Sequence, residues 1–184
     1  LHRAGRPVVV LERAASVGGR VRSSQVDGFT LDHGFQVLFT AYPTLMRYLD
    51  PKRLALRPFQ PAAHIVRNGR EALVGDAIAD ITLLWSTLTT GVLPWTDKLR
   101  LALLRRHAQR LSIEACFAPV YAEHSTRDFL ASRGFSRATI DGFFAPFYGG
   151  IFLDRSLSTS ASILLFTFKM LAAGATAVPA RGMG

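Results

Sequence analysis

The feature that most constrains the fold of this chain is a short apolar run that ends in an acid. Pro7–Leu11 reads Pro-Val-Val-Val-Leu, and Glu12 and Arg13 follow directly. A continuous run of β-branched residues predicts a strand buried on both faces, as in a parallel sheet covered by helices. In a dinucleotide-binding fold, the acidic side chain at the end of such a strand accepts the ribose hydroxyls. The run therefore predicts an α/β unit with Glu12 at its ligand-binding edge.

A glycine pair follows this acid at a short spacing. Gly18 and Gly19 allow a backbone to approach a ligand closely, and the Arg20 guanidinium offers a fork of donors suited to pyrophosphate oxygens. The ribose-binding acid normally lies about 20 residues after a glycine-rich phosphate loop, which would place that loop ahead of Leu1. Because residues 1–5 also have the pattern of a last helical turn closed by glycine, we expect an internal segment of a longer protein.

The remaining pattern predicts hairpins followed by helices. A hairpin, or a strand that enters a second layer, is expected at 21–35 around Asp27-Gly28, and a hairpin that turns on Asn68-Gly69 is expected at 64–74. Helices are expected at 43–49, 97–115, 125–134, 136–146 and 159–173. Pro146 and Gly149-Gly150 are expected to end the fourth of these helices.

Composition excludes several classes of protein. The chain has 22 Lys and Arg residues against 13 Asp and Glu, a formal net charge of +9, and 49% hydrophobic residues. This apolar content excludes a disordered chain, and the single cysteine, Cys116, excludes a disulfide framework and predicts no metal site. The basic residues are scattered from Arg3 to Arg181, which favours a solvated surface over a nucleic-acid-binding stripe.

The relation to membranes stays open at one helix. Lys98–Arg110 is basic enough either to face solvent or to touch anionic lipid. The apolar window Ala161–Val178 contains Lys169 and Gly174, so it predicts a buried helix rather than a membrane span. The arginine bias and the lack of a leader-type segment favour a cytoplasmic protein, with peripheral membrane contact as an open alternative.

Several motifs resemble those of the flavin-containing amine oxidase and phytoene desaturase superfamily. Proteins of that superfamily carry an acid, a Gly-Gly-Arg and an Asp-x-Gly in this order. The matching segments here are Leu11-Glu12-Arg13, Gly18-Gly19-Arg20, Phe29-Thr30-Leu31-Asp32-His33-Gly34, the run from Phe144 to Phe152, and Pro179–Met183, which is similar to a Pro-x-Gly-Gly-Met turn. The resemblance covers nearly the whole chain.

The resemblance implies an enzyme that uses FAD. It assigns Glu12 to the adenosine ribose and Arg13 to the neighbourhood of the adenine. It places Gly18, Gly19 and Arg20 along the pyrophosphate and ribityl chain. It places Gly34, Phe35 and Gln36 near the flavin ring.

The resemblance also implies a division of the chain. Residues 1–50 would form part of a Rossmann-like FAD-binding domain, 51–157 a largely helical substrate domain of α+β type, and 158–184 a helix and turn that return to the FAD domain. Arg181 departs from the pattern, since the family usually has glycine there. Because the phosphate loop and a C-terminal flavin-contacting segment are also missing, we expect these 184 residues to be inactive by themselves.

The expected reaction is removal of a hydride from a C–N or C–C bond of an amine or apolar substrate. The cofactor carries the electron chemistry in such enzymes, and we assign no catalytic residue from the sequence. The histidines lie at no diagnostic spacing and are interpreted as structural: His33, His64, His107 and His124. Phe144, Phe147 and Tyr148 are candidates for an apolar substrate pocket, and ordinary core packing explains them equally well.

Two other functions remain as alternatives. One is a nicotinamide-dependent dehydrogenase, which shares the acid at the end of a strand but fits the Gly-Gly-Arg and Asp-x-Gly motifs less well. The other is a non-catalytic basic module that binds a membrane or nucleic acid, which would show strong salt dependence and no chromophore. We expect a small-molecule substrate and no nucleic-acid partner. The sequence leaves the substrate, the electron acceptor and the oligomeric state undetermined.

Overall fold

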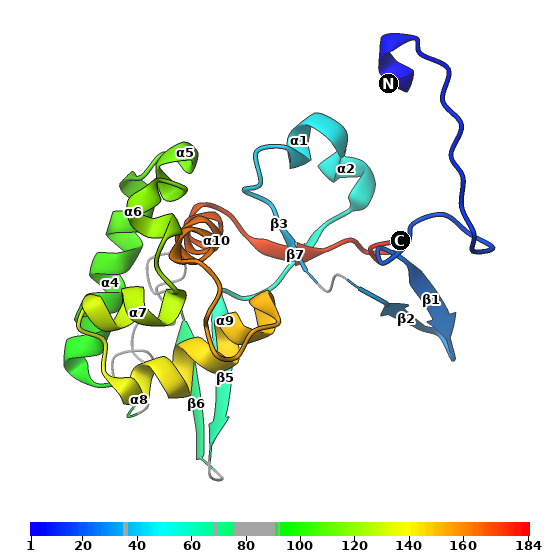
Figure 1. The fold of residues 1–184 in the computed structure, drawn as a ribbon. Coiled ribbons are helices and arrows are strands. Elements are labelled where there is room, and N and C mark those ends of the chain that lie inside the picture. Colours follow the sequence, from blue (N-terminus) through cyan, green and yellow to red (C-terminus); the bar gives the residue numbers. More distant parts are fainter. Residues whose placement is uncertain (35–36, 68–69, 76–90, 92) are drawn as a thin grey trace.

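A computed structural model of the chain describes residues 1–34, 37–67, 70–75, 91 and 93–184. Within these ranges the architecture is α+β: most helices gather on one side, and small antiparallel sheets lie beside and below them (Figure 1). The extended N-terminal segment lies on the opposite side from the helices, and the C-terminus ends beside the first hairpin.

Every strand pair in the described part of the chain is antiparallel. A central three-stranded sheet has the order β3-β7-β4, formed by Leu38–Phe39, Thr176–Val178 and Arg57–Pro58. Two hairpins stand apart from it: β1 (Ser23–Val26) with β2 (Phe29–Asp32), and β5 (Ala62–Arg67) with β6 (Arg70–Gly75). Because β7 lies between β3 and β4, residues 176–178 are joined to residues 38–39 and 57–58, which lie more than 100 positions earlier in the sequence.

The β1–β2 hairpin forms where the sequence predicts it. Asp27 and Gly28 adopt φ angles of 50° and 83°, the two left-handed conformations that a tight hairpin turn of this kind requires. The β5–β6 strands confirm the second predicted hairpin, while its expected turn at Asn68-Gly69 lies outside the described residues.

Short helices accompany the sheets and longer ones form the helical side. Beside the sheets are the 3₁₀ turn η1 (His2–Ala4), α1 (Leu45–Tyr48) and α2 (Pro51–Leu54). The helical side comprises α4 (Trp95–Arg110), α5 (Ile113–Cys116), α6 (Pro119–Ala122), α7 (Thr126–Ser132), α8 (Arg137–Thr139), η3 (Ile140–Phe144), α9 (Ala145–Phe152) and α10 (Ala161–Ala173). Serine side chains accept backbone N–H groups at four helix starts: Ser112, Ser125, Ser136 and Ser160. The cap at Ser112 divides the predicted 97–115 helix into α4 and α5.

The hydrophobic core lies where α10 packs against the other helices. It includes the fully buried side chains of Leu130, Phe144, Leu157, Leu164 and Leu165. Leu104 and Ala108 of α4 are buried in the same core, which confirms the apolar stripe predicted for that helix. The core therefore joins segments from about 104 to 171 into one packed unit.

The helix that was expected to end at Pro146 instead continues to Phe152. Residues 140–144 form a π-helical segment, in which the Ala145 N–H donates to the Ile140 carbonyl five residues back. Pro146 then occupies the first turn of α9, where its missing N–H is tolerated. The local widening of the helix thus accommodates the proline, and α9 ends at Leu153, which adopts a left-handed φ of 56°.

The strand predicted at Pro7–Leu11 is wrong for this structure. These residues form no strand, and Val9, Val10 and Leu11 are 83%, 72% and 92% exposed. A strand of this composition requires neighbours that donate to its backbone and cover both its faces. None of the segments that the structure describes pairs with it, so it stays extended and open to solvent (Figure 1).

Candidate functional site

Three glycine-containing segments meet at the base of the first hairpin: residues 18–24, 30–34 and 179–184, here called the glycine junction. The Met183 N–H donates to Asp32 Oδ1 at 2.9 Å, and the Gly184 N–H donates to Ser23 Oγ at 2.9 Å. Ser23 Oγ in turn donates to Asp32 Oδ1 at 2.5 Å. Asp32 and Ser23 therefore fasten the end of the chain to the hairpin.

The close approach of these segments depends on glycine. A Cβ atom at Gly34 would overlap the Arg20 carbonyl oxygen. At Gly182, where φ is 91°, a Cβ would lie 2.5 Å from Ser23 Oγ and 3.0 Å from Asp32 Oδ1. Larger side chains would push the segments apart, which gives the Asp-x-Gly motif and the C-terminal turn a common physical role.

The glycine pair combines one crowded and one open position: a Cβ at Gly18 would lie 2.6 Å from the Val21 carbonyl oxygen, whereas Gly19 faces open space. Gly18 and Gly19 adopt φ angles of 117° and 58°, and the Val21 N–H closes a turn on the Gly18 carbonyl at 2.9 Å. The space that a Gly19 Cβ would occupy holds no atom within 4 Å, and the Arg20 side chain beside it is exposed. A ligand can therefore reach this backbone, with a guanidinium next to it.

Glu12 and Arg13 are also exposed, on the extended N-terminal segment. Glu12 Oε1 accepts the Ala14 N–H at 2.8 Å, and Oε2 has no partner among the residues that the structure describes. One carboxylate oxygen is thus free to accept ribose hydroxyls. The structure does not place Glu12 at the end of a strand, and Phe35 and Gln36 lie outside the described residues.

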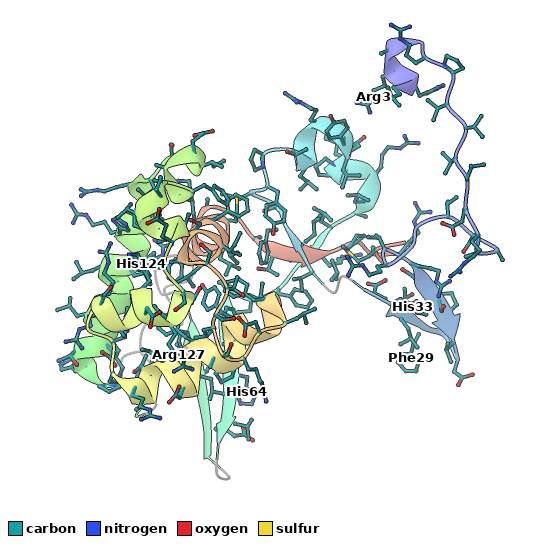
Figure 2. All side chains as sticks on the ribbon, viewed as in Figure 1. Arg3, Phe29, His33, His64, His124 and Arg127 are labelled. Carbon is teal, nitrogen blue, oxygen red and sulfur yellow. The ribbon has the colours of Figure 1, made fainter. Side chains whose placement is uncertain are left out.

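Three of the histidines, His33, His64 and His107, make side-chain contacts. His33 Nε2 lies 2.6 Å from Ser24 Oγ on the β1–β2 hairpin, and Figure 2 shows His64 apart from it on β5, where it lies 3.1 Å from Glu71. His107 Nε2 lies 3.0 Å from Tyr121 Oη, and burial together with the Arg133 charge lowers the pKa of His107. In the described ranges no group of three His, Cys, Asp or Glu side chains could hold a metal ion.

The thiol of Cys116 is buried in the core. Cys116 has no solvent exposure, and burial raises the pKa of its thiol. A thiol held in the neutral form and away from solvent is a poor nucleophile. Cys116 is therefore a core residue.

The predicted substrate-pocket residues divide between core and surface. Phe144 and Tyr148 are 0% and 2% exposed, and both belong to the hydrophobic core. Phe147 is 36% exposed and stacks parallel to Phe143 at a ring distance of 6.1 Å. Of the three, only Phe147 is placed to meet a ligand from solvent.

An apolar groove opens elsewhere, between α1 and the helices α5 and α10. Its volume is about 500 Å³, and its walls are Tyr42, Pro43, Thr44, Leu45, Tyr48, Leu49, Ile113, Phe117 and Phe166. Tyr42 and Phe166 stack there with centroids 5.8 Å apart, and burial raises the pKa of Tyr42. The groove joins the N-terminal part of the chain to the helical side.

Sequence reasoning missed three residues of the glycine junction. Ser23 carried no signal, because a lone serine before a hairpin is common. Asp32 stood inside the Asp-x-Gly motif, and Gly182 inside the C-terminal turn, but neither was given a role. The C-terminal turn follows Asp32 by about 150 residues, and this separation in sequence hid the contact between Met183 and Asp32.

The described fold is α+β, and its glycine junction includes an exposed arginine, Arg20. Residues 1–184 match the family described as flavin-containing amine oxidoreductase, and the chain belongs to this family. It is therefore related to flavin-dependent oxidoreductases over its whole length, which confirms the resemblance seen in the motifs. No curated protein matches the chain. In the described segments no helix has the length and hydropathy needed to cross a membrane.

Proposed function

We propose that this chain is part of an FAD-dependent oxidoreductase that removes a hydride from a C–N or C–C bond of an amine or apolar substrate. The observation that carries the proposal is the glycine junction, in a chain of the flavin-containing amine oxidoreductase family. The junction brings the Gly-Gly-Arg, Asp-x-Gly and C-terminal turn motifs together, although they are far apart in sequence.

The residues present fit FAD in two respects. The backbone at Gly19 faces open space beside the Arg20 guanidinium, which suits the negatively charged pyrophosphate. Glu12 has a carboxylate oxygen free to accept ribose hydroxyls, and Arg13 follows it on the same exposed segment. In this proposal, Gly34, Phe35 and Gln36 approach the flavin ring.

FAD, when bound, accepts the hydride that the substrate loses. The protein's own part is to hold the cofactor and to keep the junction closed. Asp32 does the latter, since its carboxylate accepts from Ser23 and from the Met183 backbone. We assign no proton transfer to a side chain.

The same proposal divides the chain. Residues 1–50 and 158–184 would belong to a Rossmann-like FAD-binding domain, and 51–157 to a substrate domain. The three-stranded sheet supports a link between the outer segments, since β7 pairs with β3. A Rossmann-like setting would also supply the neighbours that Pro7–Leu11 lacks.

We further propose that the apolar groove between α1 and α10 receives the apolar part of the substrate. Its walls are mostly aromatic and aliphatic, and such surface favours an uncharged carbon skeleton. Phe147, half-exposed on α9, is the second candidate contact.

The test is the absorption spectrum, in the flavin region, of the purified full-length protein of which this chain is proposed to be part, before and after denaturation releases any bound ligand. A flavin spectrum, with FAD in the supernatant, is the expected result. Replacing Glu12 by Gln should weaken FAD retention about tenfold, the effect of one lost charge-assisted hydrogen bond. The matched control is Glu123→Gln, an exposed acid on the helical side.

A colourless protein that takes up no added FAD would overturn the proposal. Tight uptake of a nicotinamide dinucleotide by such a protein would favour the dehydrogenase alternative. Salt-sensitive binding to nucleic acid or vesicles without any chromophore would favour the basic module.

A further inference from the structure

A second pocket, of about 670 Å³, adjoins the C-terminal turn and is dominated by arginine. Four arginines line it, and they come from four separate segments of the chain. Arg3 is on η1, Arg47 on α1, Arg53 on α2, and Arg181 on the turn after β7. We call it the arginine pocket; its other walls are Tyr48, Leu49, Asp50, Pro51 and Leu54.

Two hydrogen bonds to backbone carbonyls hold the segments of this pocket next to one another. Arg3 Nη1 donates to the Arg47 carbonyl at 3.1 Å, and Figure 2 shows Arg3 on η1, away from the helical side. The Ala180 N–H donates to the Leu54 carbonyl at 3.2 Å, which holds Arg181 next to the end of α2. The convergence is thus fixed by hydrogen bonds of the fold and does not depend on the arginine side chains attracting one another.

The lining holds four arginines against one acid, Asp50, so the pocket carries a net positive charge. In the part of the chain that the structure describes, no carboxylate pairs with Arg47, Arg53 or Arg181. The one acid in the lining, Asp50, uses its Oδ1 to cap α2 by accepting the Lys52 N–H at 3.0 Å. What distinguishes this place is that four arginines line one pocket, whereas Arg127, for example, pairs with Asp141.

Four like charges around one cavity repel each other, and an anion placed between them removes that repulsion. Guanidinium groups present planar pairs of N–H donors that match the oxygens of phosphate groups. Several such forks around one cavity suit a group with more than one negative charge. Tyr48 and Leu49 add an apolar edge to the pocket, which can lie against an organic substituent.

From this geometry we infer that the arginine pocket binds a phosphate-bearing ligand, with a diphosphate group held between Arg47, Arg53 and Arg181. The lining of this pocket includes none of Gly18, Gly19 and Arg20, which the proposed function assigns to FAD, although Arg181 belongs to the 179–184 segment of the glycine junction. The pocket also gives a reason for Arg181, which stands where the resembling family usually has glycine. A glycine there would remove one of the four charges.

Binding of inorganic pyrophosphate to the purified protein tests this inference, measured by calorimetry in the presence of saturating FAD. Saturating FAD separates this site from the cofactor site, so the result stands or falls independently of the proposed function. The test variant combines Arg53→Gln with Arg181→Gly. The matched control combines Arg106→Gln with Arg110→Gln. Both arginines are exposed on α4, and replacing them removes the same net charge as the test variant does.

We expect wild-type protein to bind pyrophosphate, the test variant to bind it at least about tenfold more weakly, and the control to bind it as wild type does. Circular dichroism of both variants establishes that they fold. No binding by wild-type protein, or an equal loss in the control, would overturn the inference. Vesicles with an anionic phospholipid that compete with pyrophosphate would identify a lipid headgroup as the source of the phosphate, and failure to compete would identify a free phosphorylated molecule.

Discussion

The most exacting prediction concerns Asp97, a buried carboxylate that links two helices. Its side chain has no solvent exposure and lies in the first turn of α4, where a negative charge favours the helix. Its Oδ2 accepts from Ser136 Oγ at 2.5 Å, the Ser136 N–H at 3.1 Å and Thr139 Oγ1 at 2.5 Å. Its Oδ1 accepts from Arg100 Nη1 at 2.6 Å. One carboxylate thus joins the start of α4 to the start of α8.

Replacing Asp97 by Asn keeps the shape but places an amide N–H₂ against a donor. The amide group is expected to face Arg100, whose side chain is 37% exposed and can turn toward water. The bonds from Ser136 and Thr139 then remain but lose the charge of their acceptor. Since a hydrogen bond to a charged group contributes about 1.5–3 kcal/mol and a neutral one about 1, the free energy of unfolding should fall by about 2–4 kcal/mol.

The loss should depend on pH. Burial opposes ionisation of Asp97, but hydrogen bonds from Ser136, Thr139 and Arg100 outweigh it, so the pKa of this carboxyl lies below its usual value. A carboxyl whose pKa is lower in the folded state stabilises the fold above its unfolded pKa, about 3.9. That contribution is lost as the pH falls further, through the folded pKa. The difference between wild type and Asp97→Asn should therefore be full near neutral pH and shrink below about pH 4.

Urea denaturation followed by far-ultraviolet circular dichroism measures this difference. Asp141→Asn is the matched control, because Asp141 forms ion pairs with Arg127 and Arg137 but its side chain is 46% exposed. We expect the unfolding midpoint of this variant to stay at the wild-type value. Equal midpoints for wild type and Asp97→Asn would refute the reasoning. So would a destabilisation that persists unchanged well below pH 4.

Two further predictions concern the aromatic cluster and the glycine junction. Phe144→Ala should lower the free energy of unfolding by about 3–5 kcal/mol, because it empties a fully buried site, whereas Phe147→Ala should change substrate affinity more than the thermal midpoint; the opposite pattern would place Phe147 in the core alone. Gly182→Ala should destabilise the protein more than Gly28→Ala in chemical denaturation, since both have a positive φ but only Gly182 meets neighbouring atoms; equal losses would show that the junction tolerates a side chain.

Local signals in the sequence predicted most of the secondary structure. The hairpin at Asp27-Gly28 and the helix caps at Ser125 and Ser136 form as expected, because a turn or a cap depends on residues within a few positions of each other. The stripe on α4 faces the core for the same reason: a helical period fixes which side chains share a face.

The two misjudged elements have different physical causes. Pro146 was expected to stop a helix, but the π-helical segment before it widens the backbone, and such a change carries no composition signal. Pro7–Leu11 was expected to be a buried strand, but a strand exists only where another strand pairs with it. Neither outcome follows from the residues of the segment itself.

The family could be identified without the structure, because motifs such as Gly18-Gly19-Arg20 are local patterns of residue type and spacing. The assignment of Glu12 and Gly18-Gly19-Arg20 to a flavin dinucleotide stays a prediction. Which distant residues meet depends on the tertiary structure. It fastened Met183 to Asp32, buried Phe144, and gathered Arg3, Arg47, Arg53 and Arg181 around one pocket. Such contacts depend on how the chain folds back on itself through β7 and α2, and spacing along the sequence does not encode that path.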